Sequence, residues 1–550
     1  MAECEEEEPL VQESTVPVVS AADPSRRSVR LARTLLPGAQ HGAAHLPALP
    51  TLPRDPGPVL APADFRGWPA CPLLWKPWRE LGILDAILTT TYRVRRDEGA
   101  LLQLAAFWSA ATNTFSFPWG EATVTLQDVA ALAGLPLVGD PVRAPVSESD
   151  DLEKEVVGAL TAVRSALHKS KKKRAFYGAW AKHFLEERTP DDGGGGGELV
   201  EHGAFLSLWL SSFVLPSPPF DVVRPETFPI AARLARGQAV ALAPAALASI
   251  YNDLSAIKRR LGSRDKEEPP FMVSAPMHIL QVWLWERFPQ LRPEKTNTAA
   301  APDDVPGGGV PRVARWHDVC TALDTRYVHK VLVSPESFEW LPYGSTSSFD
   351  LKPETCGGCW VRGHDIARSR ELLSYARCLH PCELVGMNCI EMYRPHRVAR
   401  QLGFDQDVPG NVVRVNSTWE KAWDTYNIEA KNLSFIVPNH EPGVTVKYAQ
   451  WWKPYSSACD TALANAPAAR MKRLRHLGSP VKTKMEGLPD ANSCKELHMD
   501  TAIRVPQPTQ DAAEDTQDER MRLPLWRCPI APSCMSSVPW NVWRNVLSMS

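Results

Sequence analysis

The sequence of 550 residues has no apolar run long enough to cross a membrane as a helix. Such a helix needs about 20 consecutive, mostly apolar residues. The two best candidates, residues 204–215 and 239–251, are shorter, and Pro244 interrupts the second. A secretory signal is also missing, because the opening stretch MAECEEEEPL is acidic and has no apolar core. We therefore expect a soluble intracellular protein that does not bind membranes.

The protein also has little net charge. Lys and Arg number 61 and Asp and Glu 63, which gives a formal charge of -2. The whole protein therefore has no electrostatic attraction to nucleic acid, and only a local basic patch can supply one. Twelve cysteines without a secretory signal indicate reduced thiols, not a disulfide scaffold.

The 50 prolines are too many for one compact fold and indicate long unstructured ends. Residues 1–66 join an acidic tract to a Pro- and Ala-rich segment whose apolar residues have no regular spacing. Such a segment cannot bury enough apolar surface to offset the entropy of ordering. Residues 456–550 are polar and rich in proline. We predict disorder in both ends and one domain at 67–455, with a charged insertion at about 147–200. Its glycines at 193–197 lack a following Gly-Lys-Ser/Thr and are interpreted as a linker.

Residues 101–142 have the clearest local pattern. Leu101, Leu104, Ala105 and Trp108 have helical spacing. Residues 114–117 and 122–125 are predicted strands, joined by a turn at 118–121. Next, Thr125 and Asp128 have the spacing of a helix-capping box, and the helix they open is expected to end at Gly134.

The rest of the domain is predicted to be mostly helical. Residues 203–293 contain several helical patterns, whose antiparallel packing would make one helical core. Residues 331–342 suggest a strand and an aromatic turn, and 383–392 is left open between strand and helix. Pro395 and Gly403 suit the start and end of a short helix. A last helix would bring Tyr448, Trp451 and Trp452 onto the fold.

Two strings carry a family resemblance. TNTFSFPWGEATVTLQDVAALAGLPLVGDPV, at residues 112–142, resembles the plant mobile domain, a family also called aminotransferase-like or maintenance-of-meristems-like and linked to plant transposable elements. YRPHRVARQLGFDQDVPG, at residues 393–410, resembles the C-terminal signature of the same family. The likeness extends from about residue 75 to 452. The expected fold is mainly α: a single helical domain with a small β-hairpin element and long disordered termini.

The resemblance also implies a function. It implies a nuclear, non-enzymatic interaction protein with roles in transposon silencing, genome integrity and meristem maintenance, and with phosphatase-like protein partners. The candidate interface residues are those that match the two strings: Phe117, Trp119, Glu121, Arg394, His396, Arg397, Arg400 and Gln401.

The sequence contains no residue pattern that indicates either of the two enzyme activities considered for it. Pyridoxal phosphate would need a lysine for a Schiff base and a phosphate-binding loop, and residues 101–142 contain no lysine. A transposase would need clustered carboxylates around metal ions, and the spacing of Asp97, Glu121, Asp128, Asp405 and Asp407 identifies no such triad. We expect no enzymatic activity and no cofactor.

The arginine cluster at Arg394, Arg397 and Arg400 has two interpretations. These side chains could contact phosphates or an acidic partner. They could also pair with Asp405, Asp407 or buried carbonyl groups while Val398, Leu402 and Phe404 enter the core. The closeness of the two aspartates favours the structural interpretation.

Four cysteines approach the spacing of a structural zinc site, which takes four ligands in a tetrahedron. They are Cys356, Cys359, Cys378 and Cys382. Three residues lie between the last two, one of them Pro381, so we favour free thiols. A DNA-binding protein derived from a transposase, with zinc at these cysteines, is the alternative function.

Two basic segments are candidate nuclear import signals. The first lies in the charged insertion and the second in the C-terminal tail. They comprise Lys171, Lys172, Lys173 and Arg174, and Arg470, Lys472, Arg473 and Arg475. The first could equally be a solvated helix face.

Overall fold

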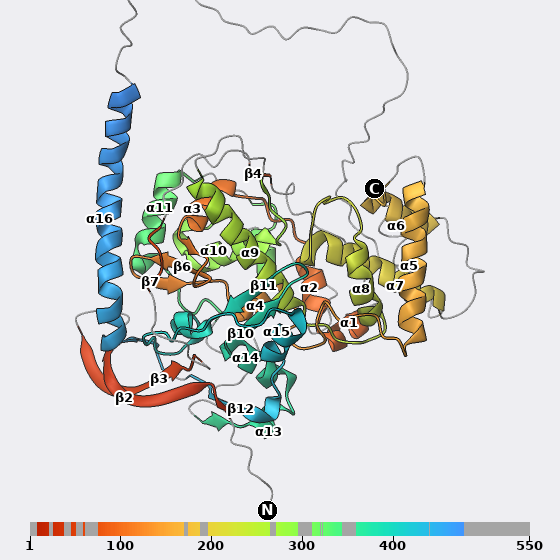
Figure 1. Ribbon diagram of the computed structural model, residues 1–550, viewed down its shortest axis with the longest axis horizontal. Helices are drawn as coiled ribbons and strands as arrows, with labels where there is room; N and C mark the ends of the chain where they lie inside the picture. The colour runs from red at the N-terminus through yellow and green to blue at the C-terminus, as the bar shows by residue number, and fades with distance from the viewer. Residues whose placement is uncertain are drawn as a thin grey trace, which may run out of the picture.

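The computed structural model describes residues 8–20, 26–37, 46–50, 59–60, 75–169, 174–186, 196–263, 271–294, 311–319, 321, 323–343, 359–438 and 440–477. As expected, the fold is mainly α with small sheets (Figure 1). The helices are α1 (Trp75–Leu81), α2 (Leu84–Thr89), α3 (Glu98–Ala105), α4 (Leu126–Ala133), α5 (Asp151–Lys169), α6 (Tyr177–Glu186), α7 (Gly196–Trp209), α8 (Phe228–Ala235), α9 (Leu242–Gly262), α10 (Met277–Arg287), α11 (Thr325–Val333), α13 (Gly363–Ile366), α14 (Arg370–Leu379), α15 (Trp419–Tyr426) and α16 (Val446–Leu477).

The strands form five small sheets within these residues. Their orders are β1-β12-β9, β10-β11, β13-β2-β3, β4-β8 and β5-β6-β7. The strands are β1 (Glu8–Pro9), β2 (Val11–Val19), β3 (Arg27–Leu35), β4 (Val59–Leu60), β5 (Trp108–Ser109), β6 (Thr114–Phe117), β7 (Gly120–Ala122), β8 (Phe271–Met272), β9 (Trp360–Val361), β10 (Cys382–Val385), β11 (Ile390–Tyr393), β12 (Leu433–Ile436) and β13 (Val444–Thr445).

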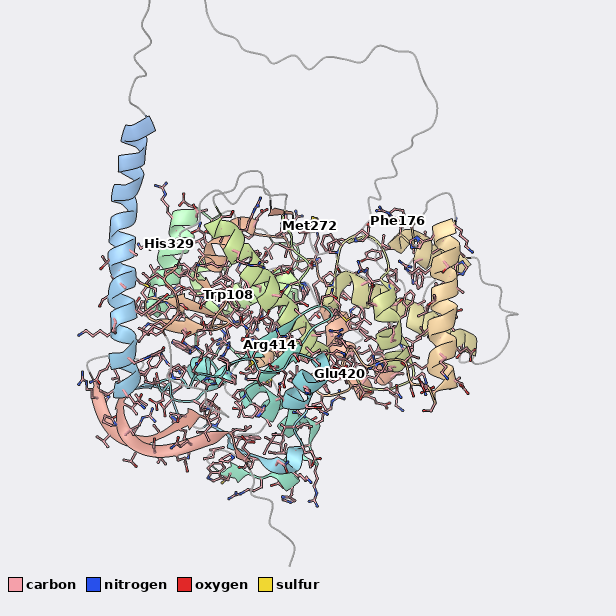
Figure 2. The ribbon with its side chains drawn as sticks, in the orientation of Figure 1. Trp108, Phe176, Met272, His329, Arg414 and Glu420 are labelled. Atoms are coloured by element: carbon pink, nitrogen blue, oxygen red, sulfur yellow. The ribbon has the colours of Figure 1, made fainter. Side chains whose placement is uncertain are left out.

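Helix α9 is the centre of the core. Its first turns are buried on nearly every side, as expected for a helix surrounded by other elements. Pro244 lies in the first turn, where its missing N–H has no helical acceptor to lose. Trp108 lies inside the helical body (Figure 2) and its Nε1 donates to Ser255 Oγ of α9 at 2.9 Å. Tyr251 of the same helix donates from its hydroxyl to the Val124 carbonyl at 2.6 Å.

The local predictions for residues 101–142 are confirmed in most details. Thr125 and Asp128 form the capping box of α4, and Gly134 ends it at φ 62°. The hairpin is tighter than predicted, because Gly120–Ala122 already forms β7 and places Glu121 in a strand. Trp108 also lies in a strand, β5, where it pairs with Phe115.

The charged insertion forms part of a second core. Helices α5 to α8 lie together at one side of the molecule (Figure 1) and bury Trp180, Phe228 and Leu160 against one another. Trp180 Nε1 donates to the Ala204 carbonyl at 3.1 Å. Gly196 already begins α7, so the predicted linker ends inside a helix. The amphipathic face of α5 explains why a highly charged segment still packs.

The prediction of disorder at 1–66 is wrong for residues 8–20 and 26–37. These form β1 and a curved hairpin of β2 and β3 that follows one side of the body (Figure 1). Strand β2 pairs with β13, and β1 with β12. The hairpin buries Val11, Val18 and Ala32, and this burial offsets the entropy lost on ordering.

Three further expectations need correction or completion. Residues 325–333 form helix α11 followed by a 3₁₀ turn, not a strand, because Asp324 caps the helix through the Arg326 N–H. The open segment near 383–392 is the hairpin of β10 and β11. Helix α16 docks through Tyr448 and Trp452 as predicted but continues past residue 455 to Leu477. No helix among the described residues has the length and apolarity needed to span a bilayer.

Asp405 ties the N-terminal hairpin to the body. Arg30 donates to both of its carboxylate oxygens, at 2.6 and 3.0 Å, and His440 Nε2 lies 3.1 Å away. The backbone N–H groups of Gly443 and Arg33 donate at 2.8 and 3.1 Å. Burial of Asp405 opposes its ionisation, but these hydrogen bonds outweigh burial and lower its pKa to about 2.

Asp405→Ala should release the hairpin and lower the free energy of unfolding by about 2–3 kcal/mol, because several donors lose their acceptor. Urea denaturation measures this loss. The folded pKa lies below the ordinary aspartate value of 3.8, so the stabilisation is present above that pH and is lost as pH falls toward 2. Asp460→Ala, at an exposed position of α16, is the control. Equal stability of the two variants at pH 7 would contradict this account.

Candidate functional site

The two signature strings meet in space. The first contributes the hairpin of β6 and β7, and the second contributes the 3₁₀ segment Pro395–Leu402. Pro395 begins this segment and Gly403, at φ 88°, ends it, as the sequence predicted. We call the contact between the hairpin and the 3₁₀ segment the signature joint.

A buried ion pair lies at the centre of the joint. Arg397 Nη2 is 2.9 Å from Glu121 Oε2, and Arg397 Nε donates to Glu121 Oε1 at 3.0 Å. Their side chains are 4% and 0% exposed. Thr114 Oγ1 also donates to Glu121 Oε1, at 2.6 Å. One hydrogen bond and one close charge contact therefore join the guanidinium to the carboxylate, and burial of both charges makes each dependent on the other.

Two glutamines complete the joint with backbone hydrogen bonds. Gln401 accepts from the Thr123 N–H and donates to the Thr123 carbonyl, both at 2.8 Å. Gln406 accepts from the Ala399 N–H at 2.9 Å and donates to the His396 carbonyl at 2.8 Å. Both amides are buried, so each fixes the path of a backbone that could not bond to water.

Arg394 and His396 face the loop that follows the 3₁₀ segment. Arg394 Nε donates to the Val412 carbonyl at 2.8 Å, and burial lowers the pKa of Arg394 to about 10. His396 Nε2 lies 3.1 Å from the Gly410 carbonyl. Burial, reinforced by the charge of Arg397, lowers the pKa of His396 to about 3, so its ring is neutral at physiological pH.

Aromatic side chains surround the tip of the hairpin. Phe117 is buried and stacks on Trp119 with ring centroids 4.7 Å apart. Trp119 is partly buried, contacts Trp340 at 5.6 Å, and donates from Nε1 to the Leu332 carbonyl at 2.9 Å. From α16, Trp452 Nε1 donates to the Pro118 carbonyl at 3.0 Å. The predicted docking helix therefore closes over this hairpin.

Arg400 differs from its neighbours in the 3₁₀ segment. Its Cζ lies 3.6 Å from the centroid of the Trp340 ring. Its Nε is buried and has no hydrogen-bond partner among the described residues. Of the eight candidate interface residues, Trp119, Arg394 and Arg400 retain solvent exposure, while the other five are buried.

The structural interpretation of the arginine cluster agrees with the contacts of two members, although Arg397 pairs with a carboxylate that was not predicted. Arg397 pairs with Glu121 and Arg394 with a backbone carbonyl, whereas Asp405 is bound by Arg30 from the N-terminal hairpin. Asp407 accepts from Thr445 Oγ1 at 2.6 Å. The prediction failed here because Arg30 lay in a segment assigned to disorder.

A second buried ion pair was not predicted from the sequence. Arg287 Nη2 lies 2.6 Å from Asp128 Oδ1, with both side chains 0% exposed. The Tyr343 hydroxyl donates to the same oxygen at 2.9 Å. Asp128 is therefore both a capping residue, as predicted, and the anchor of α10 on α4.

The cysteine candidates are divided between core and surface. Cys356 lies outside the described residues, Cys359 is exposed, and Cys378 and Cys382 are buried. Burial raises the pKa of Cys382 to about 12, which favours the protonated thiol. Cys378 Sγ donates to the Ser374 carbonyl at 3.3 Å. The described residues include no cluster of three or more potential metal ligands.

The basic segments lie at the edges of the described chain. Lys171, Lys172 and Lys173 are outside the described residues, and Arg174 is exposed. Arg470, Lys472, Arg473 and Arg475 lie in α16, so this part of the predicted disordered tail is helical.

Residues 82–453 match the family model described as plant mobile domain. A serine/threonine-protein phosphatase 7 long form homolog of Arabidopsis thaliana is 25% identical over 356 residues, which cover 63% of this chain and 24% of that protein. Protein MAIN-LIKE 2 of the same plant is 25% identical, covering 65% of this chain and 51% of that protein. Protein MAINTENANCE OF MERISTEMS is 23% identical, covering 56% and 57%. No solved structure matches the chain.

Arg397→Met is expected to lower the free energy of unfolding by about 3–5 kcal/mol, because it leaves the Glu121 carboxylate buried without its cation. Adding Glu121→Gln should recover part of this loss, since a neutral amide needs no cation. Denaturant unfolding of the two single variants and the double variant measures the coupling. Arg326→Met, at a side chain 87% exposed, is the control. Simple additivity of the two changes would contradict the joint.

Proposed function

The chain belongs to the plant mobile domain family, and on that premise we propose that it is a non-enzymatic nuclear interaction protein that acts in transposon silencing, genome integrity and meristem maintenance. The helical body presents surfaces to protein partners, and basic segments direct it to the nucleus. The chain spans between about a quarter and three fifths of the length of the relatives it matches.

The proposal depends on the observation that the candidate metal-binding carboxylates are paired with arginines. Glu121 is held by Arg397, Asp128 by Arg287 and Asp405 by Arg30. A metal-dependent nuclease needs carboxylates that converge on ions, with positions left open for water and substrate. Each of these carboxylates instead stabilises a contact between distant segments, which supports a scaffold and not a catalyst.

The names of the relatives supply the biological setting. One relative is named for the maintenance of meristems and another is named as a long form homolog of a serine/threonine phosphatase. These names motivate the proposal of a phosphatase-like nuclear partner for this chain. For nuclear import, Arg470, Lys472, Arg473 and Arg475 form a basic cluster in α16.

A transposase-derived DNA-binding protein is the second candidate function. Arg400 favours it, because its guanidinium has no carboxylate within hydrogen-bonding distance among the described residues. Phosphate binding would give affinity that falls steeply with salt. Zinc at Cys356, Cys359, Cys378 and Cys382 would accompany this function, and metal analysis of the purified protein measures it directly.

Affinity purification of the tagged full chain from nuclease-treated plant nuclei tests the proposal. We expect a defined protein partner that also binds the purified chain, and we expect the chain in the nucleus by imaging. Replacing Arg470, Lys472, Arg473 and Arg475 with glutamine should reduce the nuclear fraction, while Lys447→Gln and Lys453→Gln on the same helix should not. Recovery of DNA or zinc without any protein partner would favour the second candidate and overturn the scaffold.

A further inference from the structure

Arg400 holds a charge that the described residues do not neutralise by direct contact. The Cζ of its guanidinium lies 3.6 Å from the centroid of the Trp340 ring, which is close for a cation–π contact. None of the described residues accepts a hydrogen bond from it, and its Nε is closed off from solvent without a partner. A donor without an acceptor is costly, so a ligand that accepts hydrogen bonds from this guanidinium would be stabilised there.

The neighbouring residues keep Arg400 charged but accept no hydrogen bond from it. Burial lowers its pKa to about 10, and Tyr448, Glu441 and Asp405 oppose that shift from nearby. The Asp405 carboxylate is occupied by Arg30 and His440, and Glu441 is exposed. Arg400 is therefore protonated at neutral pH, and none of its N–H groups donates to an acceptor among the described residues.

The neighbouring side chains favour a ligand with few charges. Arg397 is held by Glu121, and Arg394 Nε donates to a carbonyl, so neither adds an open cation. Glu441 and Asp405 would repel a polyanion such as nucleic acid. The partly buried rings of Trp119 and Trp340 instead offer an apolar surface beside one guanidinium.

We infer that Arg400 and Trp340 bind the carboxylate of an acidic peptide segment of a partner protein, with an apolar side chain of that segment resting on Trp119 and Trp340. A planar guanidinium matches a carboxylate through paired hydrogen bonds. The contact with Trp340 restrains the Arg400 side chain before binding, so less side-chain entropy is lost when a ligand binds. The inference deepens the proposed interaction function and names the chemistry of the segment that docks.

Fluorescence anisotropy of the full chain tests the inference. The probe is a short fluorescein-labelled peptide with one glutamate between leucines in an otherwise uncharged sequence, and the matched probe carries glutamine in place of that glutamate. Arg400→Met keeps an unbranched side chain but removes the charge, and it should weaken binding of the acidic peptide by about ten- to a hundredfold. Glu441→Gln should strengthen it by about two- to fivefold, because one competing carboxylate is lost.

Controls separate binding from folding. Arg326→Met, at an exposed position, should leave the peptide affinity unchanged. Thermal unfolding and near-ultraviolet circular dichroism report whether Arg400→Met keeps the native fold. Equal affinity of the native-like Arg400→Met protein and the wild type overturns the inference, as does equal binding of the glutamine probe. Tighter binding of single-stranded DNA that is lost in Arg400→Met also overturns it and assigns the site to nucleic acid.

The outcomes also separate this site from the wider function. Peptide binding that depends on Arg400, in a chain that recovers no nuclear partner, supports the site and overturns the proposed function. Recovery of a partner that binds Arg400→Met as tightly as the wild type supports the proposed function and overturns the site.

Discussion

The ion pair between Glu121 and Arg397 is the interaction on which the arrangement of this protein depends. It joins residues 276 positions apart in the chain, and both charges are almost fully removed from water. Neither charge is tolerable there alone, so the β6–β7 hairpin and the 3₁₀ segment must come together for either to be buried. The pairing of Gln401 with Thr123 then fixes their relative register, and α16 covers the hairpin through Trp452.

Two other pairs of an arginine and an aspartate also hold distant segments together. Arg287 and Asp128 hold α10 against α4, and Arg30 and Asp405 hold the N-terminal hairpin against the body. The hairpin lies outside residues 82–453, the part that matches the family, yet its strand β2 pairs with β13 within that part, as the preceding strand β1 pairs with β12. Buried polar pairs of this kind contribute little net stability but penalise incorrect arrangements. This gives the acidic and basic residues of the two signature strings a role inside the fold.

Local features of this fold could be predicted from the sequence, and long-range pairings could not. The capping box of Thr125 and Asp128, the helix ends at Gly134 and Gly403 and the docking face of Tyr448 and Trp452 each depend on neighbours within a few residues. The hairpin of β2 and β3 was missed because its burial depends on contacts with residues near 405 and 444. For the candidate site, the signature strings indicated Arg400, but only the fold brings Trp340 onto it. The pairing of Arg397 with Glu121 was also not predicted, because Asp405 and Asp407 are close in sequence to the arginine cluster and were its expected partners.

Residue-resolved hydrogen exchange tests the central claim most directly, that the signature residues form a buried joint. The Thr123 N–H donates to Gln401 Oε1 at 2.8 Å and lies in the buried contact between the two strings. If the joint is formed as described, this amide exchanges only through global unfolding, with the same protection as the amides in the middle of α9. Exchange of the Thr123 N–H at the rate of an exposed loop, while α9 stays protected, would contradict the account.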